Sequence, residues 1–373
     1  MKAGIIERAR ALGVGAVRIT TASGDAPTQE RLRASFARGD LATWRYDDAY
    51  AQTAATPQAL LRGARSVICI AVAYATPAVP HRRGTGRVSN YAWSRDYHVR
   101  MQTLLRTLAS DIDALAGAPV TRVACDTAPI AERAFAARAG LGWVGKHTNL
   151  IVPKIGSFVF LGEIITTLEL EPDVPLRTSC GSCTRCIVAC PTQALRGDYT
   201  IDARRCISDL TQRTDAIPRE LRPFIGTWVW GCDICQDVCP PTRNAGAHGG
   251  EGFVPLSSDA AAPPLRDLLA LRSGAFKRTF AKTAAGWRGS AVLRRNAAVA
   301  LGNEGDRASV PALLRALGTD PHPLVRGHAA WALGRIASPR AILGLYGAAE
   351  REREPSVREE IAAALEPFAP LGR

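Results

Sequence analysis

Cys180-Gly-Ser-Cys183-Thr-Arg-Cys186-Ile-Val-Ala-Cys190-Pro191 is the most informative segment of this 373-residue chain. Its spacing, C-x2-C-x2-C-x3-C-P, is typical of bacterial ferredoxins, in which the fourth cysteine ligates the other of two iron–sulfur clusters. A second block, Cys232-x2-Cys235-x3-Cys239-Pro240, follows it, and Cys206 lies between the two. Two [4Fe–4S] clusters need eight thiolates, and these segments supply eight. The pattern therefore predicts a two-cluster domain that moves electrons one at a time.

The crossover of the fourth cysteine also predicts which thiolates share a cluster. We expect a first cluster on Cys180, Cys183, Cys186 and Cys239, and a second on Cys190, Cys206, Cys232 and Cys235. Zinc is the main alternative, because C-x2-C pairs also build four-thiolate zinc sites. A zinc ribbon, however, needs neither the third cysteine nor the x3-proline ending. Disulfides fit poorly, since nothing at the N-terminus marks the chain for export.

The charge balance of the chain is strongly basic. Lysine and arginine total 47 against 34 aspartates and glutamates, a formal net charge of +13. This excess favours a polyanionic partner, most often nucleic acid. The alternative is a protein that is rich in arginine throughout. No apolar run approaches the roughly 20 residues of a membrane span, and the first residues carry no signal sequence. We therefore expect a cytoplasmic monomer that does not enter the membrane.

Three domains are expected along the chain. In residues 1–170, strand-like runs such as VGAVRI, RSVICIAVAY, TRVACD and SFVFLGEIITTLEL alternate with helical segments such as YHVRMQTLLRTLASDIDALA. Residues 171–245 hold the cysteine blocks, and residues 246–373 begin with a linker rich in proline and glycine. The expected fold class is therefore α+β: a mixed α/β catalytic domain, a ferredoxin-like two-cluster domain, and a helical C-terminal domain.

The C-terminal domain contains an internal repeat. LRRNAAVALG starts at Leu293, VRGHAAWALG at Val325 and VREEIAAALE at Val357, and one arginine recurs in the same phase of each copy. Such repeats stack to bury a face that none buries alone, which predicts a short HEAT-like solenoid. An array of this kind either docks a long partner or stabilises the protein, and the sequence favours neither use.

Several long segments resemble epoxyqueuosine reductases. They are CDTAPIAERAFAARAGLGWVGKHTNLI (125–151), GSFVFLGEI (156–164), GTWVWGCDICQDVCP (226–240) and, upstream, GARSVICIAVAY and SNYAWSRDYH. The resemblance implies an oxidoreductase that carries a cobalamin beside two [4Fe–4S] clusters. It further implies reduction of epoxyqueuosine to queuosine at the wobble base of tRNA, the last step of queuosine biosynthesis. The electron donor is not implied.

The reaction that the resemblance implies needs proton donors as well as electrons. Removing the oxygen of an epoxide to leave an alkene takes two electrons and two protons, so a corrin would handle the electrons while the protein supplies protons. Asp126 matches the catalytic aspartate of the family's DTAP motif and is the expected proton donor and a cofactor contact. From the residues alone, it precedes a helix whose first turn holds Pro129, so a helix cap is the alternative.

The resemblance implies that the glycine-rich loop from Gly140 to Asn149 lines the cobalamin pocket, and its glycines would let the backbone approach a ligand closely. Its likeness to a P-loop is a chance match, since His147 stands where Ser or Thr is required. His147 is a candidate cobalt ligand, although a structural histidine is the favoured interpretation. The resemblance implies polar contacts to the corrin from Lys146, Thr148, Asn149 and Ser157.

Other expected site residues follow from their place in the resembling segments. Arg133 is expected to reach a phosphate or a corrin amide, whereas Glu132 is expected on a solvated helix face. Tyr91 is expected to stack on the corrin or the substrate base, with a place in the core as the alternative. The remaining expected cofactor contacts are Ser208 and Asp233, and the expected substrate contacts are Tyr97, His98, Gln212 and Arg213.

Two functions of other classes are weaker alternatives. A corrinoid reductive dehalogenase shares the cofactors but usually carries an export signal, which we do not find here. A non-enzymatic iron–sulfur electron carrier would not need the large domain of residues 1–170. If tRNA binds, arginine contacts to phosphates and a pocket for the flipped base should make binding strongly dependent on salt.

Overall fold

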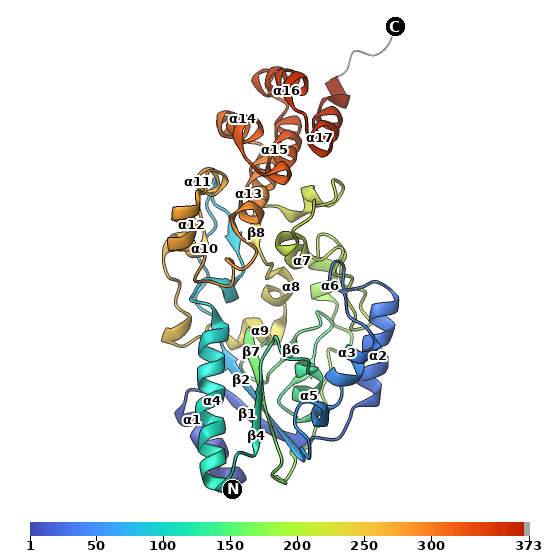
Figure 1. Ribbon diagram of the computed structural model, residues 1–373, viewed down its shortest axis with the longest axis vertical. Coiled ribbons are helices and arrows are strands. Elements are labelled where there is room, and N and C mark those ends of the chain that lie inside the picture. The colour runs from blue at the N-terminus through green and yellow to red at the C-terminus, as the bar shows by residue number, and fades with distance from the viewer. Residues whose placement is uncertain (369–373) are drawn as a thin grey trace. The chain divides into compact units, whose positions relative to one another are not determined.

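The chain forms two compact units, each assembled from separated segments. Figure 1 shows the computed structural model, which describes residues 1–368. The first unit comprises Met1–Pro77, Asp96–Cys206 and Asp233–Val254, and the second comprises Ala78–Arg95, Ile207–Cys232 and the chain from Pro255 onward. The three-domain division remains a prediction, and its last residues, 369–373, lie outside the described part. Among the described residues, no helix has the length and apolar character needed to cross a bilayer.

A four-stranded sheet forms the centre of the first unit. Strands β2 (Ser66–Ala73) and β7 (Val159–Thr166) pair with each other, β1 (Ala16–Thr21) pairs with β2, and β4 (Thr121–Ala124) pairs with β7. All three pairings are antiparallel. The run SVICIAVA of β2 is buried along almost its whole length, as expected of a β-branched strand covered on both faces. The predicted strands are confirmed.

Helices cover both faces of this sheet (Figure 1). Helices α4 (Tyr97–Ala116) and α1 (Lys2–Ala11) lie on one face, and α5 (Glu132–Arg138) packs against β2 and β7 on the other. Helix α4 has the ends that the sequence predicts. At the start of the helix, the side chain of Asp96 accepts a hydrogen bond from the His98 N–H. After its last residue, Gly117 adopts the left-handed backbone conformation.

Helix α5 begins later than the sequence predicts. Pro129 lies before the helix, not in its first turn, and the N-cap residue is Ala131. The segment from Asp126 onward instead makes tight turns, in which the Thr127 N–H donates to the Cys125 carbonyl and the Ile130 N–H donates to the Ala128 carbonyl. A residue that precedes proline is pushed out of the helical region, which delays the helix. The alternative that Asp126 caps this helix is therefore wrong.

Short helices interrupt the cysteine-rich part of the first unit. Helices α6 (Arg185–Ala189) and α8 (Ile234–Asp237) pack against each other, and α9 (Pro240–Ala245) begins at a proline, which lacks an N–H and suits the first helical position. The remaining elements of this unit are α2 (Ala26–Ala37), α3 (Asp48–Ala54), β5 (Trp143–Val144), β6 (Leu150–Ile151), and short 3-10 turns at Pro57–Ala59 and Glu251–Phe253.

The second unit is mostly helical. Its one described pair of strands, β3 (Arg87–Val88) and β8 (Trp228–Trp230), is parallel. Its helices are α7 (Ile207–Gln212), α10 (Ser258–Ala261), α11 (Leu265–Leu269), α12 (Ser273–Thr279), α13 (Ser290–Glu304), α14 (Val310–Thr319), α15 (Pro323–Ile336), α16 (Pro339–Arg351) and α17 (Pro355–Leu365). Short 3-10 turns cover Asn90–Ala92, Arg222–Ile225, Arg307–Ser309 and Glu366–Phe368.

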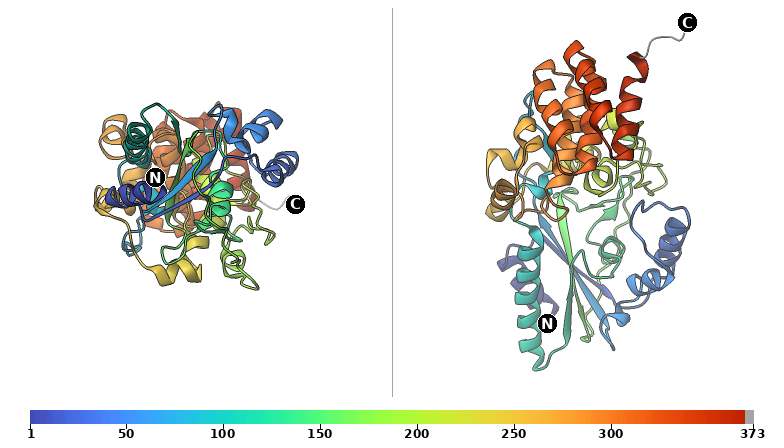
Figure 2. Two further views of the ribbon diagram at one scale, coloured as in Figure 1. Left: turned by 90° about the horizontal axis from the view of Figure 1, so that it is seen from below. Right: turned by 45° about the horizontal axis from the view of Figure 1, so that its top comes forward.

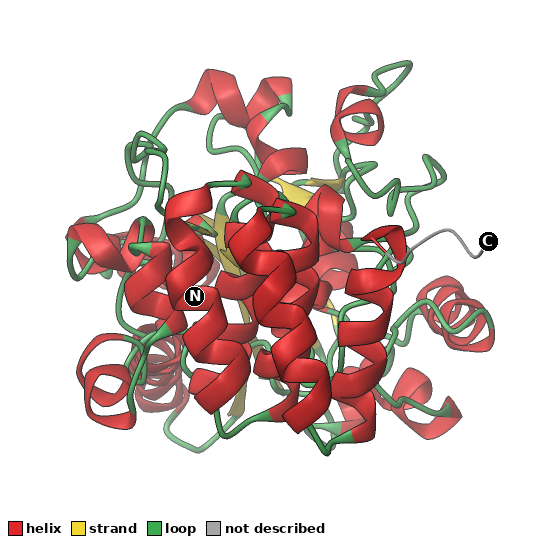
Figure 3. Cartoon of the chain, turned by 90° about the horizontal axis from the view of Figure 1, so that it is seen from above, coloured by secondary structure: helices red, strands yellow, loops and turns green. Residues whose placement is uncertain are grey.

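The three sequence copies of the repeat form α13, α15 and α17, with α14 and α16 between them. Helix α15 packs against both α13 and α17, and the helices lie side by side (Figures 2 and 3). The recurring arginine ties neighbouring helices together. Arg294 bonds Asp320 at 2.7 Å and Arg326 bonds Glu352 at 2.8 Å, and each partner lies 26 residues ahead. These two arginines therefore have a structural use within the repeat.

Helix α13 also holds the segment of residues 207–232. Arg295 and Asn296 are 0% and 1% exposed. Their N–H groups donate to the backbone carbonyl oxygens of Leu210, Thr211, Arg213, Asp215 and Val229. A buried carbonyl without a partner is costly, so these side chains stabilise a segment that has little regular structure of its own.

Candidate active site

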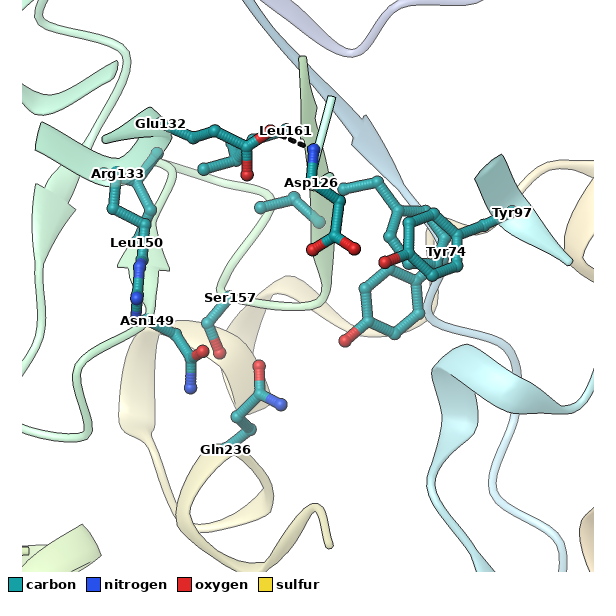
Figure 4. A pocket seen from close by; sticks show the side chains of 12 residues that line it. Tyr74, Tyr97, Asp126, Glu132, Arg133, Asn149, Leu150, Ser157, Leu161 and Gln236 are labelled. Carbon is teal, nitrogen blue, oxygen red and sulfur yellow. Dashed lines mark hydrogen bonds between the residues drawn. The ribbon is translucent and has the colours of Figure 1, made fainter. Parts of the chain in front are cut away.

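A cavity of about 250 Å³ lies at one end of the four-stranded sheet. Strand β2 ends there beside the start of its antiparallel neighbour β7, with Ala73 paired to Val159. Tyr74 follows β2, and Asp126 follows β4. The cavity, seen in Figure 4, is lined by Tyr74, Tyr97, Asp126, Glu132, Arg133, Asn149, Leu150, Ser157, Val159, Phe160, Leu161 and Gln236. The sheet thus brings together side chains from many parts of the sequence.

One wall of the cavity is aromatic. The rings of Tyr97 and Phe160 stack with centroids 4.0 Å apart, and Tyr74 stacks on Phe160 at 4.3 Å. The imidazole of His98 stacks on Tyr97 at 4.1 Å. Stacked rings of this kind present a flat apolar surface with hydroxyl groups at its edge, which suits a planar ligand.

His98 lies between two aspartates. Its Nε2 is 2.9 Å from Oδ2 of Asp126, and its Nδ1 is 2.7 Å from Oδ1 of Asp96. The hydrogen bonds to Asp126 and then to Asp96 raise the pKa of His98 to about 9. At neutral pH the ring is therefore an imidazolium that donates from both nitrogens. Asp126 accepts one of these hydrogen bonds. Its carboxylate faces the cavity (Figure 4).

Glu132 fixes the backbone of the segment that carries Asp126. Its Oε1 accepts a hydrogen bond from the Asp126 N–H at 2.5 Å (Figure 4). Asp126 has a left-handed φ of 50°, which is uncommon for a residue other than glycine and needs such support. The expectation that Glu132 lies on a solvated helix face is wrong, because it lines the cavity and is half-buried.

The structure places the expected corrin contacts in two groups. Arg133, Asn149 and Ser157 line the cavity, and Nη1 of Arg133 donates to the Thr148 carbonyl at 2.7 Å. Lys146 instead lies at the first cysteine block: its N–H donates to Sγ of Cys180, and its Nζ donates to the Gly181 carbonyl at 2.8 Å. The glycine-rich loop therefore joins the cavity to the cysteines.

The glycines of this loop are explained by the protein's own packing. A Cβ on Gly140, whose φ is +76°, would lie 2.2 Å from the Val174 carbonyl oxygen, and a Cβ on Gly142 would lie 2.3 Å from the Ile151 carbonyl oxygen. His147 is buried, which lowers its pKa to about 4. Its Nδ1 accepts from the Asn149 N–H, so the proton lies on Nε2. This tautomer leaves Nε2 without a free lone pair for cobalt, and Nε2 has no hydrogen-bond partner among the described residues, so the role of His147 stays a prediction.

Burial and neighbouring thiols raise the pKa values of three cysteines of the first unit. Burial raises the pKa of Cys239, with added effects from Cys180 and Cys183, and burial followed by Cys180 and Cys239 raises that of Cys186. Burial is the main cause of the raised pKa of Cys235, followed by the charges of Cys206 and Asp233, with Cys186 and Cys190 also acting. Nowhere in residues 1–368 do ligating side chains converge tightly enough to hold a single metal ion.

Four expected contacts lie in the second unit. The hydroxyl of Tyr91 accepts from Nε1 of Trp230 at 2.9 Å, and Nε2 of Gln212 donates to Oγ of Ser208 at 3.1 Å. Arg213 is 7% exposed and bonds Asp209 at 2.5 Å, so the protein itself neutralises its charge. Asp233, in the first unit, is buried two residues before Cys235 and acts on its pKa.

Sequence reasoning missed several residues of the cavity. Tyr74 and Phe160 look like core residues of apolar strands, and no pattern separates them from their neighbours. Gln236 lies between Cys235 and Cys239, and the spacing of the cysteines says nothing about the residues between them. Glu163, which contacts Glu132 from behind, did leave a signal: it is the one charged residue within the apolar run FVFLGEIIT.

Two groups of cysteines with ferredoxin spacing, next to a cavity with acid–base side chains, define an iron–sulfur oxidoreductase. Three family models match the chain: a 4Fe-4S double cluster binding domain over residues 179–242, epoxyqueuosine reductase QueG (DUF1730) over 55–127, and HEAT repeats over 287–366. The chain belongs to the epoxyqueuosine reductase family. It is 35% identical to the epoxyqueuosine reductase of Bacillus subtilis (strain 168), covering 98% of this chain and 95% of that relative.

Further relatives and solved structures agree over most of the chain. The epoxyqueuosine reductase of Xanthomonas campestris is 38% identical, covering 82% of this chain and 88% of the relative. A crystal structure of epoxyqueuosine reductase with an epoxyqueuosine-modified tRNA-Tyr stem loop superimposes with a TM-score of 0.92, at 36% identity over 98% of each chain. In another, from Bacillus subtilis, the catalytic loop is swung out of the active site; its TM-score is 0.91, at 35% identity over 98% of each chain. The predicted fold class is confirmed.

Proposed function

We propose that this protein reduces epoxyqueuosine to queuosine at the wobble position of tRNA, with cobalamin and two [4Fe–4S] clusters. The observation that carries the proposal is the Asp126–His98 pair at the cavity of a chain that is 36% identical to an enzyme solved with epoxyqueuosine-modified RNA. The reaction is the net addition of two electrons and two protons to the epoxide, giving an alkene and water. The substrate is tRNA, the protein acts as a cytoplasmic monomer, and a separate donor supplies the electrons.

The residues around the cavity fit one part of a cobalamin. Its volume of about 250 Å³ is below the roughly 300–1,000 Å³ of pockets that enclose a drug-sized ligand, so it can enclose only part of a macrocycle. Asn149, Ser157 and Gln236 turn amide and hydroxyl groups into the same space (Figure 4), and these groups match the amide side chains of a corrin. When bound, cobalamin would supply the low-potential two-electron chemistry that single clusters lack.

The side chains at the cavity would hold and deliver protons. Asp126 would pass a proton to the substrate, and His98 would replace it through the Nε2 to Oδ2 hydrogen bond. Tyr97, which lines the cavity, is the proposed substrate contact there, and Gln212 and Arg213 are proposed contacts from the second unit. Arg133, Lys146, Thr148, Tyr91, Ser208 and Asp233 complete the proposed cofactor set.

The eight cysteines would hold the clusters in the crossed arrangement. The effect of Cys180 and Cys183 on the pKa of Cys239 supports the first set, and the effect of Cys206 on the pKa of Cys235 supports the pairing of these two in the second. Lys146 donates its N–H to Sγ of Cys180, and hydrogen bonds to cluster sulfurs tune the reduction potential. The glycine-rich loop therefore contacts Cys180, a ligand of the first proposed cluster.

Conversion in a single turnover tests this function. Protein reconstituted without oxygen, with cobalamin and a low-potential reductant, is mixed with epoxyqueuosine-containing tRNA, and the digested nucleosides are analysed by mass spectrometry. We expect loss of one oxygen only when cobalamin is present, and none with Asp126→Asn that still binds tRNA. A fully loaded protein that leaves epoxyqueuosine intact would refute the proposal, and halogenated small molecules would then test the dehalogenase alternative.

A further inference from the structure

Glu163 is a carboxyl group in the interior of the sheet. It lies on the central strand β7, between Cys69 of β2 and Ala124 of β4, and is 0% exposed. Its neighbour Gly162 faces α4, where a Cβ would lie 2.8 Å from a methyl carbon of Leu105. Because side chains alternate along a strand, Glu163 points to the other face, toward α5.

No ordinary donor satisfies this group. Within residues 1–368, no N–H or hydroxyl donor hydrogen-bonds either carboxyl oxygen of Glu163. Its hydrogen-bonding partner is the carboxyl group of Glu132, at the start of α5. Two ionised carboxylates in such contact repel each other, so the pair holds one proton at neutral pH. Burial, followed by the charge of Glu132, raises the pKa of Glu163 well above its ordinary value, which keeps the proton there at neutral pH.

The neighbouring charges do not remove the repulsion between the carboxyl groups of Glu132 and Glu163. The thiols of Cys69 on β2 and Cys125 after β4 face both glutamates, and burial raises the pKa of each thiol, so both are neutral. Asp126 adds a further negative charge next to Glu132, and Arg133 is the one cation that lowers the pKa of Glu132. No basic side chain of the described residues ion-pairs with Glu163. The cost of a second ionised carboxylate therefore holds one proton on the pair.

The pair reaches from the interior to the cavity. Glu132 lines the cavity, and its Oε1 accepts the Asp126 N–H at 2.5 Å, whereas Glu163 lies behind it and is sealed from solvent. A proton on Glu163 can therefore reach the cavity through Glu132, beside the residue that we propose as the proton donor. The two carboxyl groups form a proton store that opens toward the substrate.

We propose that Glu163 and Glu132 share one stored proton and deliver it as the second proton of the epoxide reduction. The two electrons come from the clusters through the cofactor, and the Asp126–His98 pair supplies the first proton. The second moves from Glu163 to Glu132 and from there to the oxygen that leaves as water. The pair regains its proton from solvent after product leaves. Only the use of the proton rests on the proposed function; its presence does not.

Infrared spectroscopy tests the presence of the proton without any turnover. Reconstituted holoprotein with 13C-labelled glutamate should show the carbonyl band of a protonated glutamic acid at pH 7. Glu163→Gln should abolish this band, Glu132→Gln should shift it, and Glu169→Gln, which changes an exposed glutamate that pairs with Arg65, should leave it unchanged. No such band in the wild type, or a band that persists in Glu163→Gln, would overturn the inference.

The pH profile of conversion tests its use. Without Glu163 to hold the proton, Glu132 ionises at a lower pH. Conversion by Glu163→Gln should thus stay near the wild-type rate at pH 6 and fall by about 10²-fold at pH 8.5, the range of a lost acid catalyst. A profile that matches the wild type would refute delivery while leaving the stored proton in place. If even the wild type converts nothing, the proposed function fails, and the infrared band still decides whether the pair holds a proton.

Discussion

The charge on His98 can be measured directly. Its pKa rises from 6.5 to about 9 because Asp126 and Asp96 both accept its protons. At 1.36 kcal/mol per unit, this corresponds to about 3 kcal/mol in favour of the charged ring. Solvent screening of a side chain that keeps 27% of its surface exposed reduces the value to about 2 kcal/mol. Because the folded-state pKa is raised, this stabilisation is complete below pH 6.5 and is lost as the pH rises through about 9.

Nuclear magnetic resonance of 13C-histidine-labelled protein provides the assay. The resonance that disappears in His98→Gln should titrate near pH 9 in the wild type. Asp126→Asn should lower this midpoint by more than Asp96→Asn does, since the bond to Asp126 contributes most. His147 and His328 serve as internal references, because burial lowers their pKa values and they stay neutral above pH 7. A wild-type midpoint near 6.5, or one that Asp126→Asn leaves in place, would refute the proton-holding role of this pair.

The other predictions concern the clusters and the packing. Cys239→Ser and Cys190→Ser should each remove about half of the iron and leave different clusters; identical electron paramagnetic resonance spectra from the two remaining clusters would contradict the crossed assignment. Arg295→Met should lower the free energy of unfolding of the second unit by at least about 3 kcal/mol, because several buried carbonyls lose their donor. The control Arg315→Met, at an exposed position, should change it by less than about 0.5 kcal/mol. Unfolding by denaturant measures both variants. Gly140→Ala should be destabilising by more than about 1 kcal/mol, since φ is +76° and the Val174 carbonyl blocks a methyl group, and a stability equal to wild type would refute the close approach.

Local patterns predicted the regular elements well. Helix α4 could be delimited from sequence because its apolar spacing, the cap at Asp96 and the glycine after Ala116 all act within one turn of its ends. The start of α5 could not, because Pro129 and the bond from the Asp126 N–H to Glu132 hold the preceding residues in turns. That bond depends on where Glu163 holds Glu132, and such a tertiary contact leaves no periodic signal.

The candidate site likewise contains residues that the sequence predicts and residues that only the fold brings together. The predicted cluster ligands follow from cysteine spacing, since the geometry of a cluster dictates it, and the role of Asp126 follows from its motif; both remain predictions. The cavity itself joins the ends of three strands with a loop and with Gln236 of α8, and only the fold brings these together. Glu163 shows what a closer reading of the sequence can recover, because a single carboxylate within a buried strand demands a partner.

The repeat positions also explain what one face of the helical array does. Asn296, His328 and Glu360 occupy the same phase of the three copies, and each bonds the segment of residues 207–232. Asn296 donates to backbone carbonyls, Nε2 of His328 accepts the Ile217 N–H at 3.2 Å, and Glu360 accepts two hydrogen bonds from Arg222.

The same face of the three repeat helices thus provides an amide donor, an imidazole acceptor and a carboxylate acceptor to one irregular segment. This segment ends at a proposed cluster ligand, Cys232. A face already filled in this way is not free to bind a partner. This row therefore stabilises the protein, and any contact of the repeats with tRNA must use another face of the array.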